Sequence, residues 1–156
     1  MLYDHEGVPR YIGESGDLQH RIWSNHCVGD PNSHKWVCRY NAGRLWHVRN
    51  HDYTNENDGK TAKQLRAILA RRFCAVRVLP IPELIQKSDR LALERAVQAI
   101  APDPMNDWVN QKRIPASEPE DLVDQLLDDL GWGVAQRSAL DRQAELWRRM
   151  RAASTA

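Results

Sequence analysis

Three polar residues of this 156-residue chain have side chains that could act together on a phosphodiester: Tyr11, Arg21 and Glu94. Arginine is a permanent planar cation, which suits a phosphate oxygen. Glutamate can hold Mg²⁺ or Mn²⁺, hard cations that keep several waters and also bind phosphate. Hydrolysis of a phosphodiester needs an activated water and a counter-charge for the phosphoryl oxygens, and a tyrosine hydroxyl can position either group.

Each of these residues also has an ordinary structural interpretation when taken alone. Tyr11 would be a half-buried strand aromatic, and Arg21 and Glu94 would be exposed helix charges. Asn106, which follows Pro102 by four residues, would be a turn or cap residue. Only their order along the chain, with suitable elements between them, favours a functional interpretation.

The elements that must position these residues begin with a hairpin. Residues 2–3 and 8–12 are apolar or β-branched, and they flank the turn cluster 4–7. Asp17 is of the type that begins helices, and we expect a helix from there to about residue 25. Residues 55–59 are expected to form a loop.

The middle of the chain predicts a helix, a strand and a second helix. Residues 61–72 have apolar side chains at helical spacing, and residues 73–79 have the composition of a strand. A helix starting at Ser88 or Asp89 should end before Pro102. Its inward face would carry three apolar residues, Leu93, Val97 and Ile100.

The chain is therefore expected to form an α+β fold, a small antiparallel three-stranded sheet flanked by helices with a helical C-terminal appendage. We expect a first domain over residues 1–113, with an irregular basic insertion at 27–60. The appendage, residues 114–156, would hold an acidic helix at about 120–130, a Gly-Trp-Gly break and a basic amphipathic helix at about 138–151.

Two segments resemble the GIY-YIG nuclease superfamily. YIGESGDLQHR, residues 11–21, has that family's second tyrosine, its glycine, its capping residue, its leucine and its arginine in register. LERAVQAIAPDPMN, residues 93–106, is similar to the family's metal-binding helix and terminal asparagine. His26 resembles the histidine that often follows the arginine, at a spacing longer by about one residue.

The resemblance covers roughly residues 1–110 and implies a cytoplasmic, Mg²⁺- or Mn²⁺-dependent endonuclease that hydrolyses DNA. Glu94 would hold the metal, and Gly13 would let the backbone approach the DNA closely. The catalytic residues would be Tyr11, Arg21, Tyr3, His26 and Asn106.

Tyr3 is included because the family's first tyrosine is displaced or missing here. It should precede the second by about eleven residues, whereas Tyr3 precedes Tyr11 by eight. Tyr3 could substitute from its shifted position, the version seen here could lack that tyrosine, or a Gly-Ile-Tyr or Gly-Val-Tyr strand could lie upstream of Met1. Side chains alternate faces along a strand, so the first alternative would place the hydroxyl differently.

The net charge of +1 is unevenly distributed. Residues 20–77 carry seven more basic than acidic side chains, and residues 114–130 have six acids and no base. Aromatic residues alternate with the basic ones, which suits a nucleic-acid backbone and its bases, although charge runs are often only solvated surface. The expected DNA contacts are Arg39, Arg44, Arg49, Lys63 and Arg66.

Other classes of protein fit the sequence less well. No apolar run approaches the roughly 18 residues that span a bilayer, and we expect three reduced cysteines. A zinc site at 26–38 is disfavoured because Cys-x-x-Cys spacing is missing. Two alternatives to a nuclease stay open: a non-catalytic DNA-binding relative, and a protein-binding role for residues 114–156.

Overall fold

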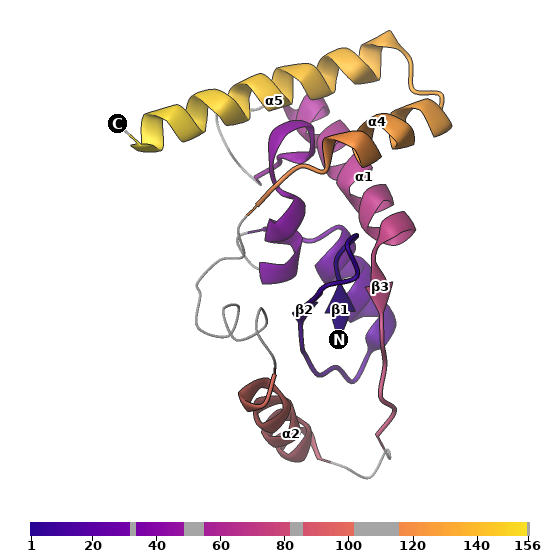
Figure 1. Cartoon of the computed structure of the whole chain (residues 1–156), viewed down its shortest axis with the longest axis vertical. Helices are drawn as coiled ribbons and strands as arrows, with labels where there is room; N and C mark the ends of the chain where they lie inside the picture. The colour runs from indigo at the N-terminus through magenta and orange to yellow at the C-terminus, as the bar shows by residue number, and fades with distance from the viewer. Residues whose placement is uncertain (32–33, 49–54, 82–85, 102–115, 156) are drawn as a thin grey trace.

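The structure is a computed structural model that describes residues 1–31, 34–48, 55–81, 86–101 and 116–155. A small sheet near the N-terminus lies against short helices, and longer helices cover one end of the molecule (Figure 1). The expected α+β fold with a three-stranded antiparallel sheet is therefore confirmed.

The sheet has β1 (Leu2–Tyr3) at its centre, between β2 (Pro9–Tyr11) and β3 (Ala75–Val76). Leu2 lies opposite Tyr11 on one side and Val76 on the other. β3 is shorter than the predicted strand because β1 offers only two residues for pairing. Past β3, the amino group of Met1 donates to the carbonyl oxygen of Arg77 at 2.9 Å.

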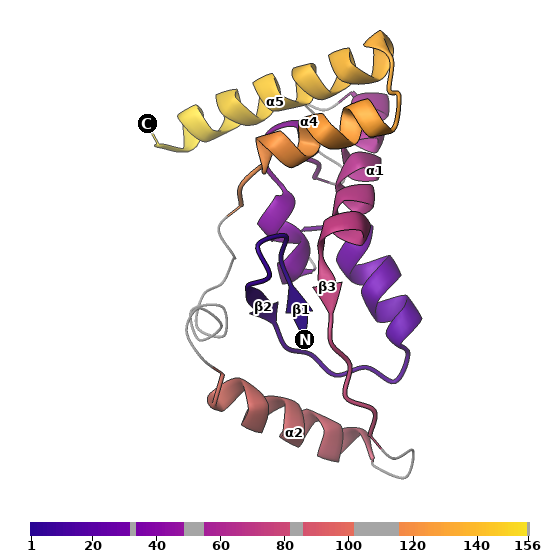
Figure 2. The same ribbon diagram turned by 45° about the vertical axis from the view of Figure 1, so that its right-hand side comes forward.

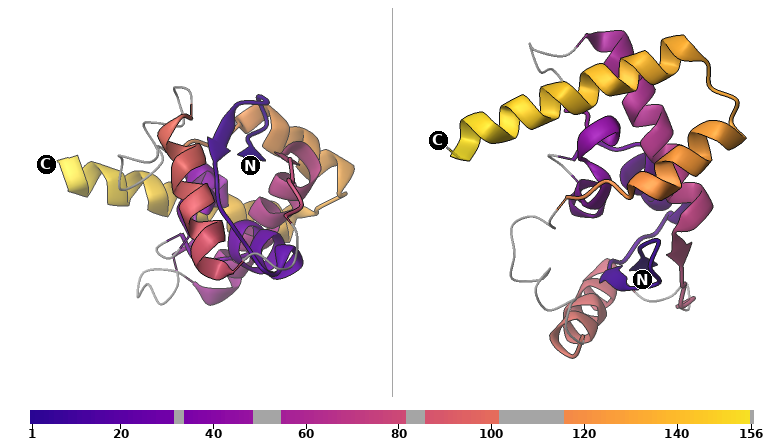
Figure 3. Two further views of the ribbon diagram at one scale, coloured as in Figure 1. Left: turned by 90° about the horizontal axis from the view of Figure 1, so that it is seen from below. Right: turned by 45° about the horizontal axis from the view of Figure 1, so that its top comes forward.

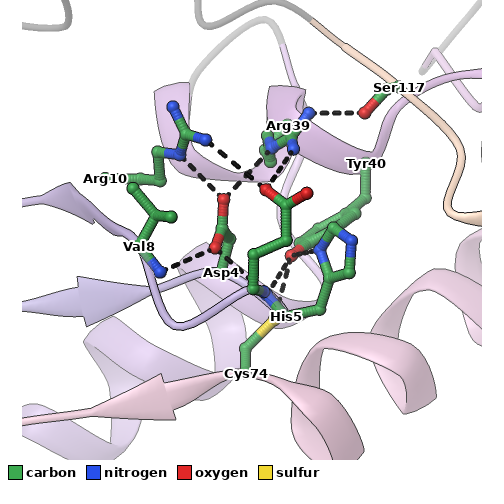
Figure 4. Close-up of polar contacts among 9 residues, drawn as sticks. Asp4, His5, Val8, Arg10, Arg39, Tyr40, Cys74 and Ser117 are labelled. Atoms are coloured by element: carbon green, nitrogen blue, oxygen red, sulfur yellow. Dashed lines mark hydrogen bonds and ion pairs between the residues drawn. The ribbon is translucent and has the colours of Figure 1, made fainter. Parts of the chain in front are cut away.

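The hairpin turn is held by a buried carboxylate. Asp4, 1% exposed, accepts hydrogen bonds from the backbone N–H groups of Glu6 and Val8 at 3.1 and 3.0 Å (Figure 4). The guanidinium of Arg10 donates to the other oxygen at 2.7 Å. Gly7 takes a positive φ of 74°, which the turn requires and glycine adopts without strain. The hydrogen bonds to Asp4, its ion pair with Arg10 and the positive φ of Gly7 all stabilise the same turn.

Three short helices follow the hairpin, namely η1 (His20–Cys27), η2 (Lys35–Tyr40) and η3 (Gly43–Leu45). Asp17 accepts the backbone N–H of His20 at 2.9 Å and so caps a helical segment that starts at residue 18 and continues as η1, as predicted. η1 has π geometry at its end, where the N–H of Val28 bonds to the carbonyl of Trp23 at 3.1 Å. Apolar and polar residues alternate weakly after residue 34, a pattern that can indicate strands. Residues 35–40 and 43–45 form 3₁₀ turns instead.

The longest central helix is α1 (Glu56–Phe73), and it starts five residues before the predicted position. The prediction of a loop at 55–59 is wrong because Asn55 caps the helix, accepting the N–H of Asn57 at 3.0 Å. Asp58 is buried and pairs with Arg142 through two hydrogen bonds of 2.7 and 2.8 Å. Residues that look like a loop in sequence therefore form the packed first turn.

α2 (Lys87–Ala99) lies beyond the end of the sheet, away from the main core (Figure 3). The prediction of its inward face is wrong at two positions, because Leu93 and Ile100 are 41% and 82% exposed. Only Val97 packs inward, in a small cluster with Ile12 and Ala101. The helix is held mainly by polar contacts with the segment after β2, and these contacts build the candidate site.

The C-terminal helices, α4 (Glu120–Asp129) and α5 (Val134–Thr155), cross α1 at the opposite end of the molecule (Figure 2). Gly131, at a φ of 61°, makes the turn between them. Leu126 and Leu140 are fully buried in the same core as Leu65 of α1. The core thus crosses the predicted boundary at residue 113. Within the described ranges, no helix has the length and apolar character needed to cross a bilayer.

Candidate functional site

The centre of the candidate site is a contact between Tyr11 at the end of β2 and Arg21 in η1. The guanidinium of Arg21 donates to the hydroxyl of Tyr11 at 2.5 Å and lies 5.9 Å from the centre of the ring. Burial raises the pKa of Tyr11, and the nearby Arg21 only partly offsets this effect. The phenol therefore keeps its proton at neutral pH.

Gly13 allows the ring of Tyr11 to fold back over the chain. A Cβ atom at position 13 would lie 2.5 Å from Cε1 and 2.7 Å from the hydroxyl oxygen of Tyr11. Contacts this short are not tolerated, so any side chain at position 13 would displace the ring. The glycine of the Tyr-Ile-Gly motif is therefore required to make room for the Tyr11 ring. The sequence suggested a different reason, that glycine lets the backbone approach DNA closely.

Glu94 of α2 belongs to the same site. Burial is the main effect and raises the pKa of its carboxyl group, as does the charge of Glu14, whereas the backbone N–H of Glu14 and the charge of Arg21 lower it. The charge of Glu94 in turn raises the pKa of Tyr11. A half-buried carboxylate on a third element thus lies near enough to the arginine and the tyrosine for their charges to affect one another.

Sequence reasoning missed the residues that hold α2 against the segment after β2. Gln98 donates one hydrogen bond to the carbonyl oxygen of Ile12 at 3.2 Å and another to Glu94 at 3.3 Å. Arg90 pairs with Glu14 at 3.0 Å. Residues 90, 94 and 98 are spaced four apart and share one face of a helix, so this spacing could have identified them.

His26, at the end of η1, lies next to Tyr11 as the resemblance implies. It is 3% exposed, and its ring meets that of Tyr11 edge-on with 4.6 Å between ring centres. Burial, together with the charges of Arg21 and His34, lowers the pKa of His26 to about 3. Neither ring nitrogen has a hydrogen-bond partner among the described residues. At neutral pH this imidazole is uncharged, and its low pKa makes it a weak base.

Tyr3 is not brought to this site. Leu2 lies opposite Tyr11 in the sheet and shares its face, so the next residue, Tyr3, points to the other face. Its ring contacts the guanidinium of Arg77, whose central carbon lies 5.6 Å from the ring centre. Asn106 and Arg49, which were also predicted as functional residues, lie outside the described residues.

Three arginines predicted to contact DNA are engaged within the fold. Arg39 pairs with Asp4 and Glu6 at 3.6 and 3.5 Å and donates to Ser117 (Figure 4). Arg44 pairs with two C-terminal acids, Glu118 and Asp124. These pairs join the N-terminal half of the molecule to α4 and the segment before it.

The third, Arg66, is 1% exposed and donates to Asn41, to the carbonyl of Leu45 at 3.3 Å and to that of Gly29 at 3.4 Å. A DNA contact at Arg66 would require it to leave the core, so its role in this structure is structural. Lys63 lies half-exposed on α1. All three arginines are therefore used within the fold, although the basic composition of the stretch suggested that they contact DNA.

A divalent metal can be accommodated only with few protein ligands. The described residues contain no group of three or more His, Cys, Asp or Glu side chains that could hold a metal ion. Glu94 offers a partly desolvated carboxylate. The carboxylate of Glu14 lies nearby but is paired with Arg90. This donor set fits Mg²⁺ or Mn²⁺, which keep several waters and bind through one or two carboxylates. It does not fit a closed structural zinc site.

Comparison with known proteins adds no further evidence: no family model, no curated protein and no solved structure matched this chain.

Proposed function

We propose that this protein is a divalent-metal-dependent endonuclease that hydrolyses phosphodiester bonds in DNA. One observation carries the proposal: the end of β2, η1 and α2, which are far apart in sequence, bring Tyr11, Arg21 and Glu94 together. A permanent cation, a protonated hydroxyl and a carboxylate in one half-buried place are the groups that phosphodiester hydrolysis uses.

Arg21 would hold a phosphate oxygen and offset the negative charge that grows on it. The same guanidinium donates to the hydroxyl of Tyr11, which would help to position a water or a phosphate oxygen by hydrogen bonding. Glu94 would hold the metal, which supplies a Lewis acid and a water of lowered pKa when it is bound. Gln98 keeps the Glu94 carboxylate aimed, because its amide is anchored on the backbone of Ile12.

A non-catalytic DNA-binding relative is the second candidate. One observation favours it: Tyr3 points to the other sheet face, so the site has one tyrosine where the family resemblance implies two. A protein-binding role for the C-terminal helices has less support, because the apolar faces of α4 and α5 are already used in the core.

Cleavage of supercoiled plasmid DNA separates the two candidates. We expect nicking with Mg²⁺ or Mn²⁺ and none with EDTA. Arg21→Ala should lower the single-turnover rate far more than the affinity for DNA, because the charge acts mainly as the phosphoryl group gains charge. Arg149→Ala, which removes an exposed arginine on α5, is the matched control. DNA binding without cleavage by the wild type would favour the non-catalytic relative.

A further inference from the structure

Two arginines, one before and one after β3 in the sequence, each lie over an aromatic ring. Arg71, near the end of α1, has its central guanidinium carbon 4.6 Å from the ring centre of Trp23 in η1. Arg77, the residue after β3, lies over Tyr3 at 5.6 Å. Figure 2 shows the end of α1 and β3 beside η1. We call these four residues the Arg–aromatic surface.

Three of the four residues of the Arg–aromatic surface are exposed, and Tyr3 is half-buried. Trp23 is 40% exposed, and both arginines are exposed. Neither arginine has an ion pair among the described residues, unlike Arg39 and Arg44. From Lys60 to Ile81 the chain has six basic residues and no acidic one. Lys60 and Arg72 pair with Glu56 and Asp129, and Arg66 is buried. Arg71 and Arg77 are therefore the cations that this surface offers to a negatively charged partner.

The chemistry of the surface points to a nucleic acid with unpaired bases. A guanidinium can donate to phosphate oxygens while its planar face stacks, and an exposed indole offers a face or edge to a base. A base within a duplex is covered by its neighbours, so only an unpaired base can stack on Trp23. An acidic peptide could form ion pairs with the arginines, but its carboxylates would make no stacking contact with the aromatic rings.

We propose that the Arg–aromatic surface binds unpaired nucleotides of the substrate, so that the protein prefers DNA in which a duplex adjoins a single strand. This inference rests on the proposed function for its choice of DNA. Trp23 belongs to η1, the helix that also carries Arg21, but residues two apart on a helix point in different directions, so the surface would lie beside the site and not within it. β3, between the two pairs, is an edge strand of the sheet that holds Tyr11.

The test is a binding titration in Ca²⁺, with a forked DNA and a full duplex containing the same sequence. The wild type should bind the fork more tightly. Trp23→Leu should raise the Kd for the fork about tenfold and leave the duplex nearly unchanged, while Trp23→Phe should retain affinity. Arg71→Ala should weaken both and lower the salt slope by about 1.

Trp147→Leu is the matched control, because the ring of Trp147 also lies under an arginine, Arg151, at 5.3 Å, but far away on α5. It should leave both affinities unchanged. The proposal is overturned if Trp23→Leu binds the fork normally, if Trp147→Leu has the larger effect, if polyglutamate competes as well as DNA, or if the wild type binds no DNA. Trp23-dependent binding without any cleavage would support this surface and count against the nuclease.

Discussion

Gly13 controls where the hydroxyl of Tyr11 lies. The side chain of Tyr11 occupies the space that a Cβ atom at position 13 would need, with two ring carbons and the hydroxyl oxygen within 3 Å of it. A tyrosine followed by an isoleucine and a glycine is common enough to mean little in a sequence. The contact with Arg21 is what gives this tripeptide a chemical consequence.

We predict that Gly13→Ala displaces the Tyr11 ring and lowers DNA cleavage by about a hundredfold, because an error of about 1 Å in a catalytic group has that effect. Thermal unfolding should show that the fold persists. Gly16→Ala is the matched control, since a Cβ there would meet only the end of Arg90 at 3.7 Å. Equal cleavage by the two variants would contradict this role of Gly13.

The buried His26, which contacts Tyr11, should make the free energy of unfolding depend on pH in the acidic range. Its pKa is lowered to about 3, mainly by burial, whereas an unfolded histidine has a pKa of about 6.5. Above pH 6.5 both states are neutral. Below about pH 6.5 the unfolded state binds the proton and the native state does not. The native state therefore loses stability as the pH falls from about 6.5 down to the native pKa of about 3.

Between pH 7.5 and pH 5, His26 should therefore lower the free energy of unfolding by about 2 kcal/mol. His34, whose pKa is also lowered, acts in the same direction. Urea denaturation at several pH values measures this slope. His26→Phe should unfold with a shallower pH dependence than the wild type, and an unchanged slope would show that His26 is not held neutral.

At the scale of elements, helix α1 has a charged residue, Arg66, buried in the core. Arg66 follows Leu65 and precedes Leu69 by three residues, so it lies on the apolar face of the helix rather than beside the exposed arginines. The helical spacing could have revealed this, but the basic composition of the stretch suggested DNA contacts instead. Burial lowers the pKa of Arg66 to about 10, and the side chain stays charged at neutral pH.

We predict that Arg66→Ala lowers the free energy of unfolding by about 3 kcal/mol, because it leaves a cavity and removes the donor to Asn41 and to the carbonyl of Leu45. Chemical denaturation measures the loss. Arg71→Ala, an exposed arginine on the same helix, should change stability by less than about 0.5 kcal/mol. If Arg66→Ala were as stable as the wild type, the buried assignment would be wrong.

The sequence predicted the elements with strong local signals and missed those that depend on distant contacts. The hairpin and α4 follow from turn residues and helical periodicity, and so does the core of α1. The 3₁₀ turns η2 and η3 do not, because their burial comes from packing against other elements. Tyr11, Arg21 and Glu94 could be named from their order along the chain, but Gln98 could be found only from its spacing to Glu94.

At the scale of the whole molecule, the C-terminal helices complete the main core. Val123, Leu126, Leu127 and Leu140 are buried in the cluster that includes Leu65 of α1. Asp58 and Arg142 join the start of α1 to α5, and Arg44 joins η3 to Glu118. The site lies at the other end of the molecule, on the sheet that packs against this core (Figure 1).

A fragment of residues 1–113 should therefore not fold on its own. It would expose the faces of α1 and η3 that α4 and α5 cover, and small domains tolerate such a loss poorly. We expect reduced helical circular dichroism and no cooperative thermal transition, in contrast to the full chain. A cooperative transition in the fragment would mean that residues 114–156 are an independent appendage after all.

The central claim is that Glu94, with Tyr11 and Arg21, forms a metal-dependent nuclease site. Glu94→Gln is the most direct test, because it removes the anionic ligand while changing the shape little. Plasmid nicking in Mg²⁺ is measured beside DNA binding in Ca²⁺, with Glu145→Gln, a remote exposed glutamate on α5, as the matched control. We predict that Glu94→Gln loses cleavage and keeps most of its DNA affinity while the control retains both; cleavage at the wild-type rate by Glu94→Gln would contradict the account.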